Sequence, residues 1–166
     1  MSDLSDLADV ERLLFVEAQY LDDKAWEAWA DLYCDDAHYW VPSWLDEYEL
    51  VTDPDAQVSY IYHTSRAQLR ERIGRIQSRK SITALPLPRT LHLISNIVLS
   101  ARDENGVEAR SSWTTHVFDP RTRRQYLHFG TYQHRLVRTV EGYRIARKKI
   151  VIMNDCIPTV VDFYSI

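Results

Sequence analysis

The chain has 166 residues and a formal net charge of −4, and 45% of its residues are hydrophobic, 27% charged and 11% aromatic. This composition is typical of a folded, soluble domain with an aromatic core and excludes a disordered chain. The negative charge argues against nucleic-acid binding, which needs clustered and uncompensated Lys and Arg. No apolar run is long enough to predict a membrane-spanning helix.

One domain over residues 1–166 is expected, because a chain of this length can bury a core of its own. The two cysteines, Cys34 and Cys156, belong to no disulfide or metal-binding motif. The N-terminus is acidic and lacks the basic and apolar parts of a signal peptide. We therefore expect a cytoplasmic protein.

Two helices are predicted at the start of the chain. Apolar residues recur at helical spacing over residues 5–20, and Glu17 is expected to face solvent. Asp22 or Asp23 is expected to cap a second helix, because aspartate accepts hydrogen bonds from free amides at a helix start. This second helix should end near Asp35.

Short extended segments and a third helix follow. The pattern predicts a strand over 37–42, a loop over 43–56 and a brief strand within 57–63. Ser65 and Gln68 then show the spacing of a capping box, which predicts the start of an arginine-rich helix.

The second half of the chain changes to strand periodicity. Turn sequences separate four extended segments, which are 89–101, 107–118, 124–139 and 143–155. We therefore predict an antiparallel meander. Three helices packed on one side of a strongly curved antiparallel sheet give an α+β fold.

Strict alternation in the first of these strands predicts two faces. One face would hold Leu91, Leu93, Ile97 and Leu99, and the other His92, Ile94, Asn96 and Val98. Four histidines occupy even positions of the strands, and some of them should gather on one sheet face as structural residues. They are His92, His116, His128 and His134.

The acidic and aromatic stretch 22–42 is the first candidate for chemistry. Asp36 and His38 are two residues apart, so on a strand both would point to one face, the concave side of the sheet if it forms a pocket. The competing interpretation, which we favour, is helix capping and core packing. No nucleotide-binding loop, activated nucleophile or metal-ligand motif appears.

Three stretches carry a resemblance when they are taken together. They are 15–42, 88–97 and 143–155, the last containing the basic run RIARKK. In this combination the sequence resembles the small (β) subunit of aromatic-ring-hydroxylating dioxygenases over nearly its whole length. The segments YWVPSW and DPDAQVSYIYH are most similar to the benzoate, toluate, anthranilate and halobenzoate group.

The resemblance implies a cone-shaped fold of the nuclear-transport-factor-2 (NTF2) or ketosteroid-isomerase type. It implies a structural β subunit of a terminal oxygenase that cis-dihydroxylates an aromatic carboxylate such as benzoate. The partners would be catalytic α subunits and other β subunits in an α3β3 hexamer. The α subunit would carry a Rieske [2Fe–2S] cluster and a mononuclear Fe(II), and a reductase would supply electrons from NAD(P)H.

For this chain we accordingly expect no catalytic, cofactor-binding or metal-binding residue. Exposed basic side chains are the candidates for contacts between subunits, since the RIARKK run alternates along a strand and sends charge to both faces. These candidates are Arg66, Arg70, Arg89, Arg147, Lys148 and Lys149.

Two other functions stay open. One is a stand-alone dehydratase or isomerase on the same cone, acting on a small cyclic or aromatic substrate with Asp36, His38 or Tyr39 as acid and base. The other is a small scaffold protein that associates with itself through its sheet.

Overall fold

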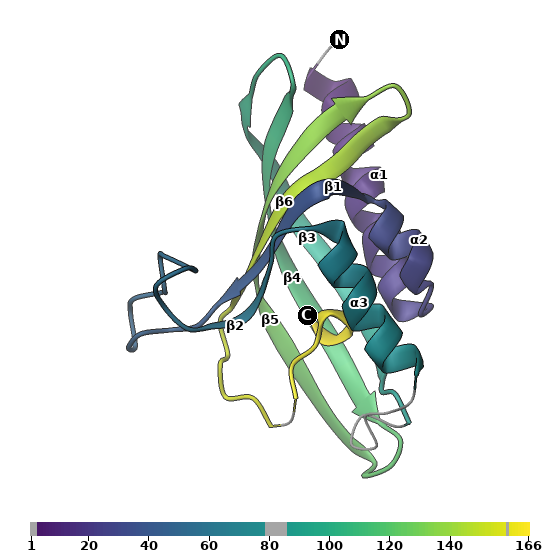
Figure 1. Cartoon of the computed structure of the whole chain (residues 1–166), viewed down its shortest axis with the longest axis vertical. Coiled ribbons are helices and arrows are strands. Elements are labelled where there is room, and N and C mark those ends of the chain that lie inside the picture. The colour runs from purple at the N-terminus through teal and green to yellow at the C-terminus, as the bar shows by residue number, and fades with distance from the viewer. Residues whose placement is uncertain (1–2, 79–85, 159) are drawn as a thin grey trace.

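The computed structural model describes residues 3–78, 86–158 and 160–166 of the chain. Figure 1 shows the helices beside a long twisted sheet, with the C-terminal residues folded back against the helices. The elements are α1 (Asp3–Asp22), α2 (Trp26–Asp31), β1 (Tyr33–Pro42), β2 (Ser59–His63), α3 (Arg66–Gln77), β3 (Arg89–Arg102), β4 (Gly106–Asp119), β5 (Arg124–Thr139), β6 (Gly142–Ile152) and a 3-10 helix, η2 (Phe163–Ser165). Within these described ranges, no helix has the length and apolar character needed to cross a membrane.

The described strands form one six-stranded sheet in the order β2-β1-β6-β5-β4-β3. The meander from β3 to β6 is antiparallel, as predicted. The expectation of a wholly antiparallel sheet is wrong at one pair, because β1 runs parallel to β6. The sheet is therefore mixed, and the α+β class is confirmed.

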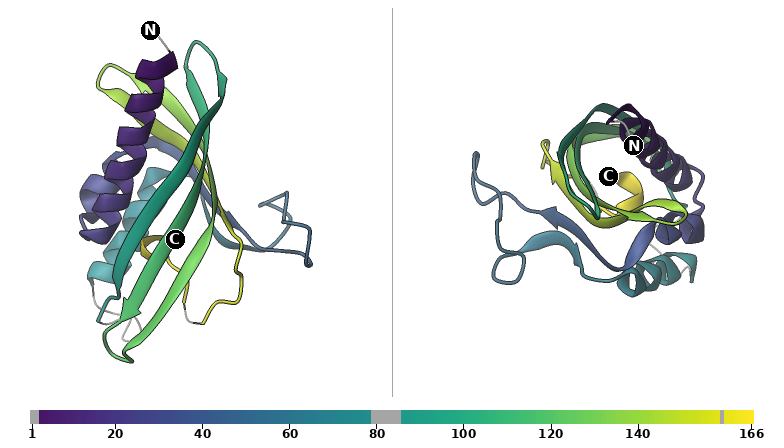
Figure 2. Two further views of the ribbon diagram at one scale, coloured as in Figure 1. Left: turned by 180° about the vertical axis from the view of Figure 1, so that it is seen from behind. Right: turned by 90° about the horizontal axis from the view of Figure 1, so that it is seen from above.

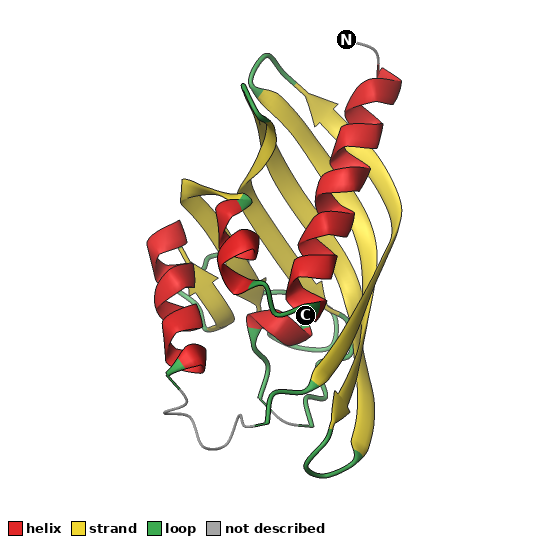
Figure 3. Cartoon of the chain, turned by 90° about the vertical axis from the view of Figure 1, so that its right-hand side faces the viewer, coloured by secondary structure: helices red, strands yellow, loops and turns green. Residues whose placement is uncertain are grey.

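The sheet curls around the helices. Seen from above in Figure 2, its strands bend into an open ring with the C-terminus inside. Figure 3 shows α1, α2 and α3 side by side on the concave side. We call this concave side the inner face and the opposite side the outer face. The inner face holds the core, because residues at alternate positions of β4 and β5 are buried there.

The C-terminal segment completes the core between the helices. The ring of Trp29 stacks on Phe163 with centroids 4.7 Å apart, and Trp26 meets the same ring edge-on at 5.4 Å. Asp162 caps η2 and accepts hydrogen bonds from Nε of Arg72 at 3.1 Å and from its terminal nitrogen at 2.6 Å. These contacts hold η2 against α2 and α3.

Strand β3 changes face at Asn96. This residue has φ of 54°, in the left-handed region that asparagine tolerates better than most residues, and the pairing register shifts between Ser95 and Val98. The predicted division of this strand into two faces is therefore wrong. His92, Ile94, Ile97 and Leu99 pack inward, whereas Leu91 and Leu93 remain 55% and 51% exposed on the outer face.

The start and end of α2 also differ from expectation. The helix ends at Asp31, so Asp35 and Asp36 lie within β1 instead of ending a helix. Its N-cap is Ala25, which provides no side-chain hydrogen bond. Asp22 instead accepts hydrogen bonds from residues of β3, because the chain passes the sheet edge at that point.

Candidate functional site

A buried ion pair lies at the centre of the cone. Lys148 of β6 points to the inner face and places its Nζ 2.8 Å from Oε1 of Glu17, which lies in the middle of α1. The Tyr33 hydroxyl donates to the same oxygen at 2.5 Å, and Trp29 Nε1 donates at 3.4 Å. His134 Nε2 lies 3.7 Å from the other carboxylate oxygen. Both charged side chains are almost fully buried.

The surroundings keep this carboxylate charged. Burial alone would raise the pKa of Glu17, but Lys148 and His134 beside it hold the pKa well below its usual range. Burial lowers the pKa of His134, and burial together with Glu17 raises the pKa of Tyr33. A general base works best with a pKa near the working pH. This arrangement is therefore suited to an ion pair that organises the core, rather than to proton transfer.

Sequence reasoning placed Glu17 in solvent and Lys148 among the surface cations, and both predictions are wrong. A signal for each exists in the sequence. Glu17 follows Val10 by seven residues and precedes Leu21 by four, which places it on the apolar stripe of α1. Lys148 precedes Ile150 by two residues on an inward-facing strand. Two opposite charges on two apolar faces predict a buried pair.

A second polar group crosses the inner face nearer the C-terminal segment. His92, Thr115 and His128 are direct partners across β3, β4 and β5, so their side chains form one row. The Asp22 carboxylate lies 2.6 Å from His92 Nδ1 and accepts from the backbone N–H of His92. Among the described residues, nothing hydrogen-bonds to His92 Nε2, Thr115 Oγ1 or either ring nitrogen of His128. The predicted gathering of histidines is confirmed for the inner face, but His116 lies on the outer face.

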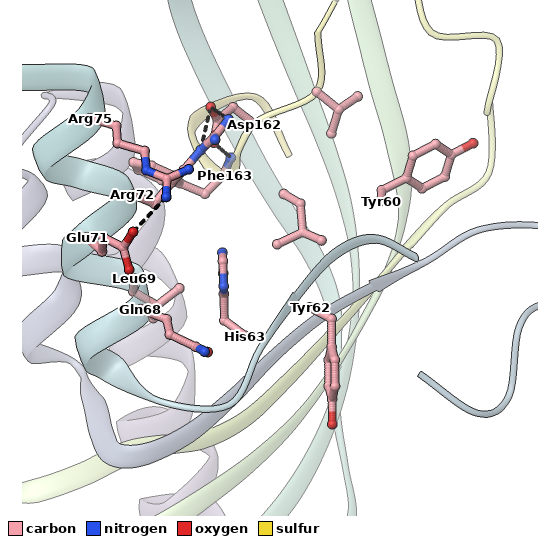
Figure 4. Close-up of a pocket in the computed structure, with 12 residues that line it drawn as sticks. Tyr60, Tyr62, His63, Gln68, Leu69, Glu71, Arg72, Arg75, Asp162 and Phe163 are labelled. Carbon is pink, nitrogen blue, oxygen red and sulfur yellow. Dashed lines mark hydrogen bonds and ion pairs between the residues drawn. The ribbon is translucent and has the colours of Figure 1, made fainter. Parts of the chain in front are cut away.

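Figure 4 shows a cleft of about 330 Å³ between α3, β2 and the segment before η2. His63 points into this cleft toward Arg72 and Glu71. Burial, with a contribution from Arg72, lowers the pKa of His63. Arg72 is paired with Asp162 and Arg75 with Glu71, so the cleft has donors and acceptors but no excess of either charge.

The three residues predicted for a cone pocket are divided between the two faces of β1. Asp36 and His38 are exposed on the outer face, whereas Tyr39 is 1% exposed on the inner face. The prediction that Asp36 and His38 point to the concave side is therefore wrong. The reason is that Ala37 and Tyr39 are the buried residues of this part of β1. Side chains alternate along a strand, so Asp36 and His38 face the other side.

The predicted interface cations have different surroundings. In α3, Ser65 caps the helix as predicted, and Arg66 and Arg70 pair within the chain, Arg66 with Asp35 and Arg70 with Asp31. In the sheet, Arg147 pairs with Glu108, Lys149 lies 4.8 Å above the ring of Trp40, and Arg89 lies 5.6 Å above that of Phe118. Lys148 is inside the cone and cannot contact a partner. The rest stay predictions.

The resemblance implies iron centres in a partner, and the described residues of this chain provide few side chains that could hold one. Cys34 is half-buried in β1 and Cys156 is exposed. A Rieske centre needs two cysteines and two histidines close together, and in the described ranges no three His, Cys, Asp or Glu side chains are placed to hold a metal ion. The residues described do not fit such a centre.

Comparison with known proteins gives the family. The family model "Ring hydroxylating beta subunit" matches residues 16–159. The chain belongs to this family. A relative of this β subunit, the 2-halobenzoate 1,2-dioxygenase small subunit of Burkholderia cepacia, is 38% identical over 98% of the chain and 97% of its own length.

Solved structures agree with this assignment. The β subunit of the benzoate 1,2-dioxygenase of Burkholderia mallei superposes on this β subunit with a TM-score of 0.81 and 32% identity, covering 97% of each chain. An NTF2-like protein of Novosphingobium aromaticivorans superposes with a TM-score of 0.61 at 16% identity, covering 92% of this chain and 84% of its own. The second likeness concerns the fold alone and confirms the predicted NTF2-like cone.

Proposed function

We propose that this chain is the structural β subunit of the terminal oxygenase of a ring-hydroxylating dioxygenase that acts on an aromatic carboxylate. The observation that carries the proposal is the family match together with relatives from dioxygenases named for 2-halobenzoate and benzoate. Both of these compounds are aromatic carboxylates. The oxygen chemistry would take place in a catalytic α subunit with a Rieske [2Fe–2S] cluster and a mononuclear iron.

The arrangement of the cone supports a structural role. Its centre is occupied by Glu17, and Lys148, Trp29 and Tyr33 all donate to one oxygen of the Glu17 carboxylate. A buried pair of this kind links α1 to β6 and favours one way of packing them. Rigid subunits keep their interface residues in place, which reduces the entropy lost on assembly.

The proposal includes an α3β3 hexamer in the cytoplasm that receives electrons from NAD(P)H through a reductase. Its test is reconstitution with a catalytic large subunit of a benzoate-type dioxygenase. Co-expression should give one complex whose mass by light scattering corresponds to three copies of each chain. Supplied with the reductase, NADH and O2, this complex should dihydroxylate benzoate. The large subunit expressed without this chain is the control.

The second measurement is metal content. The chain purified alone should contain no stoichiometric iron or acid-labile sulfide, and the reconstituted complex should contain both. Iron bound to the chain alone, or separate elution of the two subunits, would contradict the proposal. Turnover of a cyclic substrate by the chain alone would favour a stand-alone enzyme.

A further inference from the structure

One segment stands clear of the body of the molecule. Residues 43–58, which we call the arm, connect β1 to β2 and project sideways from the sheet (Figures 1 and 2). The arm contains five carboxylates and no Lys or Arg. They are Asp46, Glu47, Glu49, Asp53 and Asp55, and none of them forms an ion pair with a described residue.

The arm is held in one shape by its own hydrogen bonds. Asp46 Oδ1 accepts from the backbone N–H groups of Tyr48 and Glu49, each at 2.8 Å. Gln57 Oε1 accepts from two further backbone N–H groups of the arm. At the base, Trp44 Nε1 donates to the carbonyl of Ile152 in β6 at 2.7 Å. A fixed projection loses little entropy when it binds a partner.

Two large side chains of the arm point to water. Tyr48 is 89% exposed and Leu45 is 54% exposed, although both lie on an ordered turn. Tyrosine gives a large contact area at low entropic cost and is enriched where proteins meet. An ordered, acidic projection that exposes a tyrosine is therefore suited to a cleft with apolar walls and basic surroundings.

The outer face contains a shallow, open cleft with such walls and surroundings. It has a volume of about 400 Å³ and lies at the end of the sheet where β3 begins. Leu91, His116 and Phe118 line it, and the Arg89 guanidinium lies above the Phe118 ring. This apolar surface is extended by Leu93 in β3 and by Phe129 in β5, which lie in one row across the sheet. Leu93 is 51% exposed and Phe129 is 41% exposed.

The same end of the sheet carries unpaired positive charge. Four exposed arginines, which we call the arginine tip, surround the cleft and the turn from β4 to β5, and within the described ranges no carboxylate forms an ion pair with any of them. They are Arg89, Arg121, Arg123 and Arg124. Most other arginines do have carboxylate partners within the chain. Examples are Arg66, Arg70, Arg72, Arg75, Arg135, Arg144 and Arg147.

We propose that the arm of one copy of this chain docks on the outer face of a second copy, with Tyr48 in the cleft and the arm carboxylates against the arginine tip. The proposal deepens the proposed function by naming the surfaces through which β subunits contact each other. Arm and cleft are different surfaces, so the contact is heterologous, and repetition around a rotation axis closes a ring.

The test uses two charge-reversed chains. Chain one carries Glu47→Lys and Glu49→Lys, and chain two carries Arg89→Glu and Arg121→Glu. Each chain alone then brings like charges together, so its self-association measured by sedimentation velocity should weaken by roughly tenfold or more. An equal mixture of the two chains restores opposite charges at every contact between unlike chains and should associate again, at least to dimers, although a ring of three copies keeps one contact between like chains.

Matched variants control for charge and for exposed apolar surface. Asp23→Lys with Glu104→Lys reverses two exposed carboxylates away from both surfaces, and it should associate like the unchanged chain. Tyr48→Ser should weaken association, whereas Val140→Ser, at a fully exposed turn position, should not. Because the contact is electrostatic at its rim, raising the salt concentration should weaken association of the unchanged chain.

Three outcomes would overturn the proposal. They are an unchanged chain that stays monomeric at every concentration, reversed chains that associate normally, and a mixture that does not recover. In the first case the arm serves a different partner. Repeating the measurements with the co-expressed large subunit separates this proposal from the proposed function. If the proposed function is wrong, even the unchanged chain forms no mixed complex with the large subunit.

Discussion

Lys148 and Lys149 are neighbours in β6, yet they lie in opposite environments. Lys148 is 1% exposed and bound to Glu17 inside the cone, whereas Lys149 lies on the outer face above Trp40. Removing the partner of a buried charge leaves an uncompensated charge in the core, while a partly exposed cation–π contact contributes little. On a curved sheet, the face therefore decides the role of a charge more than the residue type does.

The largest test of this contrast is Lys148→Met against Lys149→Met. The first substitution leaves Glu17 buried without its cation and should lower the free energy of unfolding by about 3–5 kcal/mol. The second should lower it by about 1 kcal/mol or less. Urea unfolding followed by tryptophan fluorescence measures both. Equal effects would show that the two faces do not differ.

Substitutions at Asn96 test whether its left-handed backbone decides which residues of β3 reach the outer face. A β-branched residue resists the left-handed backbone of this bulge, so Asn96→Val should cost about 1–3 kcal/mol. Asn96→Gly should be nearly neutral, because glycine adopts positive φ freely. Ser95→Val, at the adjacent exposed position, is the matched control. Hydrogen exchange of β3 would show whether the register shift survives.

Protonation of His128 gives a smaller effect that depends on pH. Burial lowers the pKa of His128 in the folded chain below the unfolded value of about 6.5. The neutral ring therefore contributes stability above pH 6.5 or so, and this contribution is lost as the pH falls through the folded pKa. His128→Phe should lose less stability than the unchanged chain between about pH 7 and pH 5.

The control for that measurement is His116→Phe on the outer face. This ring lies on the face that contacts water, so its replacement should leave the slope of stability against pH as in the unchanged chain. If His116→Phe altered the slope of stability against pH as much as His128→Phe does, the two faces would not differ in this respect.

The smallest expected effect concerns the exposed ion pairs of α3. Arg70 contacts Asp31 at 2.5 Å and Glu27 at 3.8 Å, and all three side chains are about half exposed or more. Arg70→Ala should therefore change the free energy of unfolding by about 0–1 kcal/mol. A loss as large as that of Lys148→Met would contradict the contrast between buried and surface pairs.

Much of the fold could be predicted because local patterns agreed with it. The apolar stripe of α1, the Ser65 cap and the turn sequences of the meander are short-range signals, and each led to the correct element. The bulge at Asn96 could not be read from alternation, since a single left-handed residue changes every face after it. The parallel pairing of β1 with β6 joins two segments that are far apart in the sequence, and no local pattern predicts it.

The interior could be predicted only in part. The stretch 22–42 was interpreted mainly as helix capping and core packing, and its Trp29 and Tyr39 are both buried. Glu17 and Lys148 were assigned to the surface because charged residues are rarely buried unless they are paired. Their places on two apolar faces indicate that a pair is buried, but the tertiary fold is needed to show that α1 and the last strand meet there.

The parallel neighbour of β1 sets an order for folding. β1 leaves the ribosome early, but Trp40 meets Lys149 only after nearly all the remaining chain has been synthesised. The tryptophans of α2 must wait still longer for Phe163, the ring on which they pack, and contacts between distant segments form slowly. The nascent subunit therefore exposes aromatic surface for a long time, and this interval is when aggregation or capture by a chaperone competes with folding.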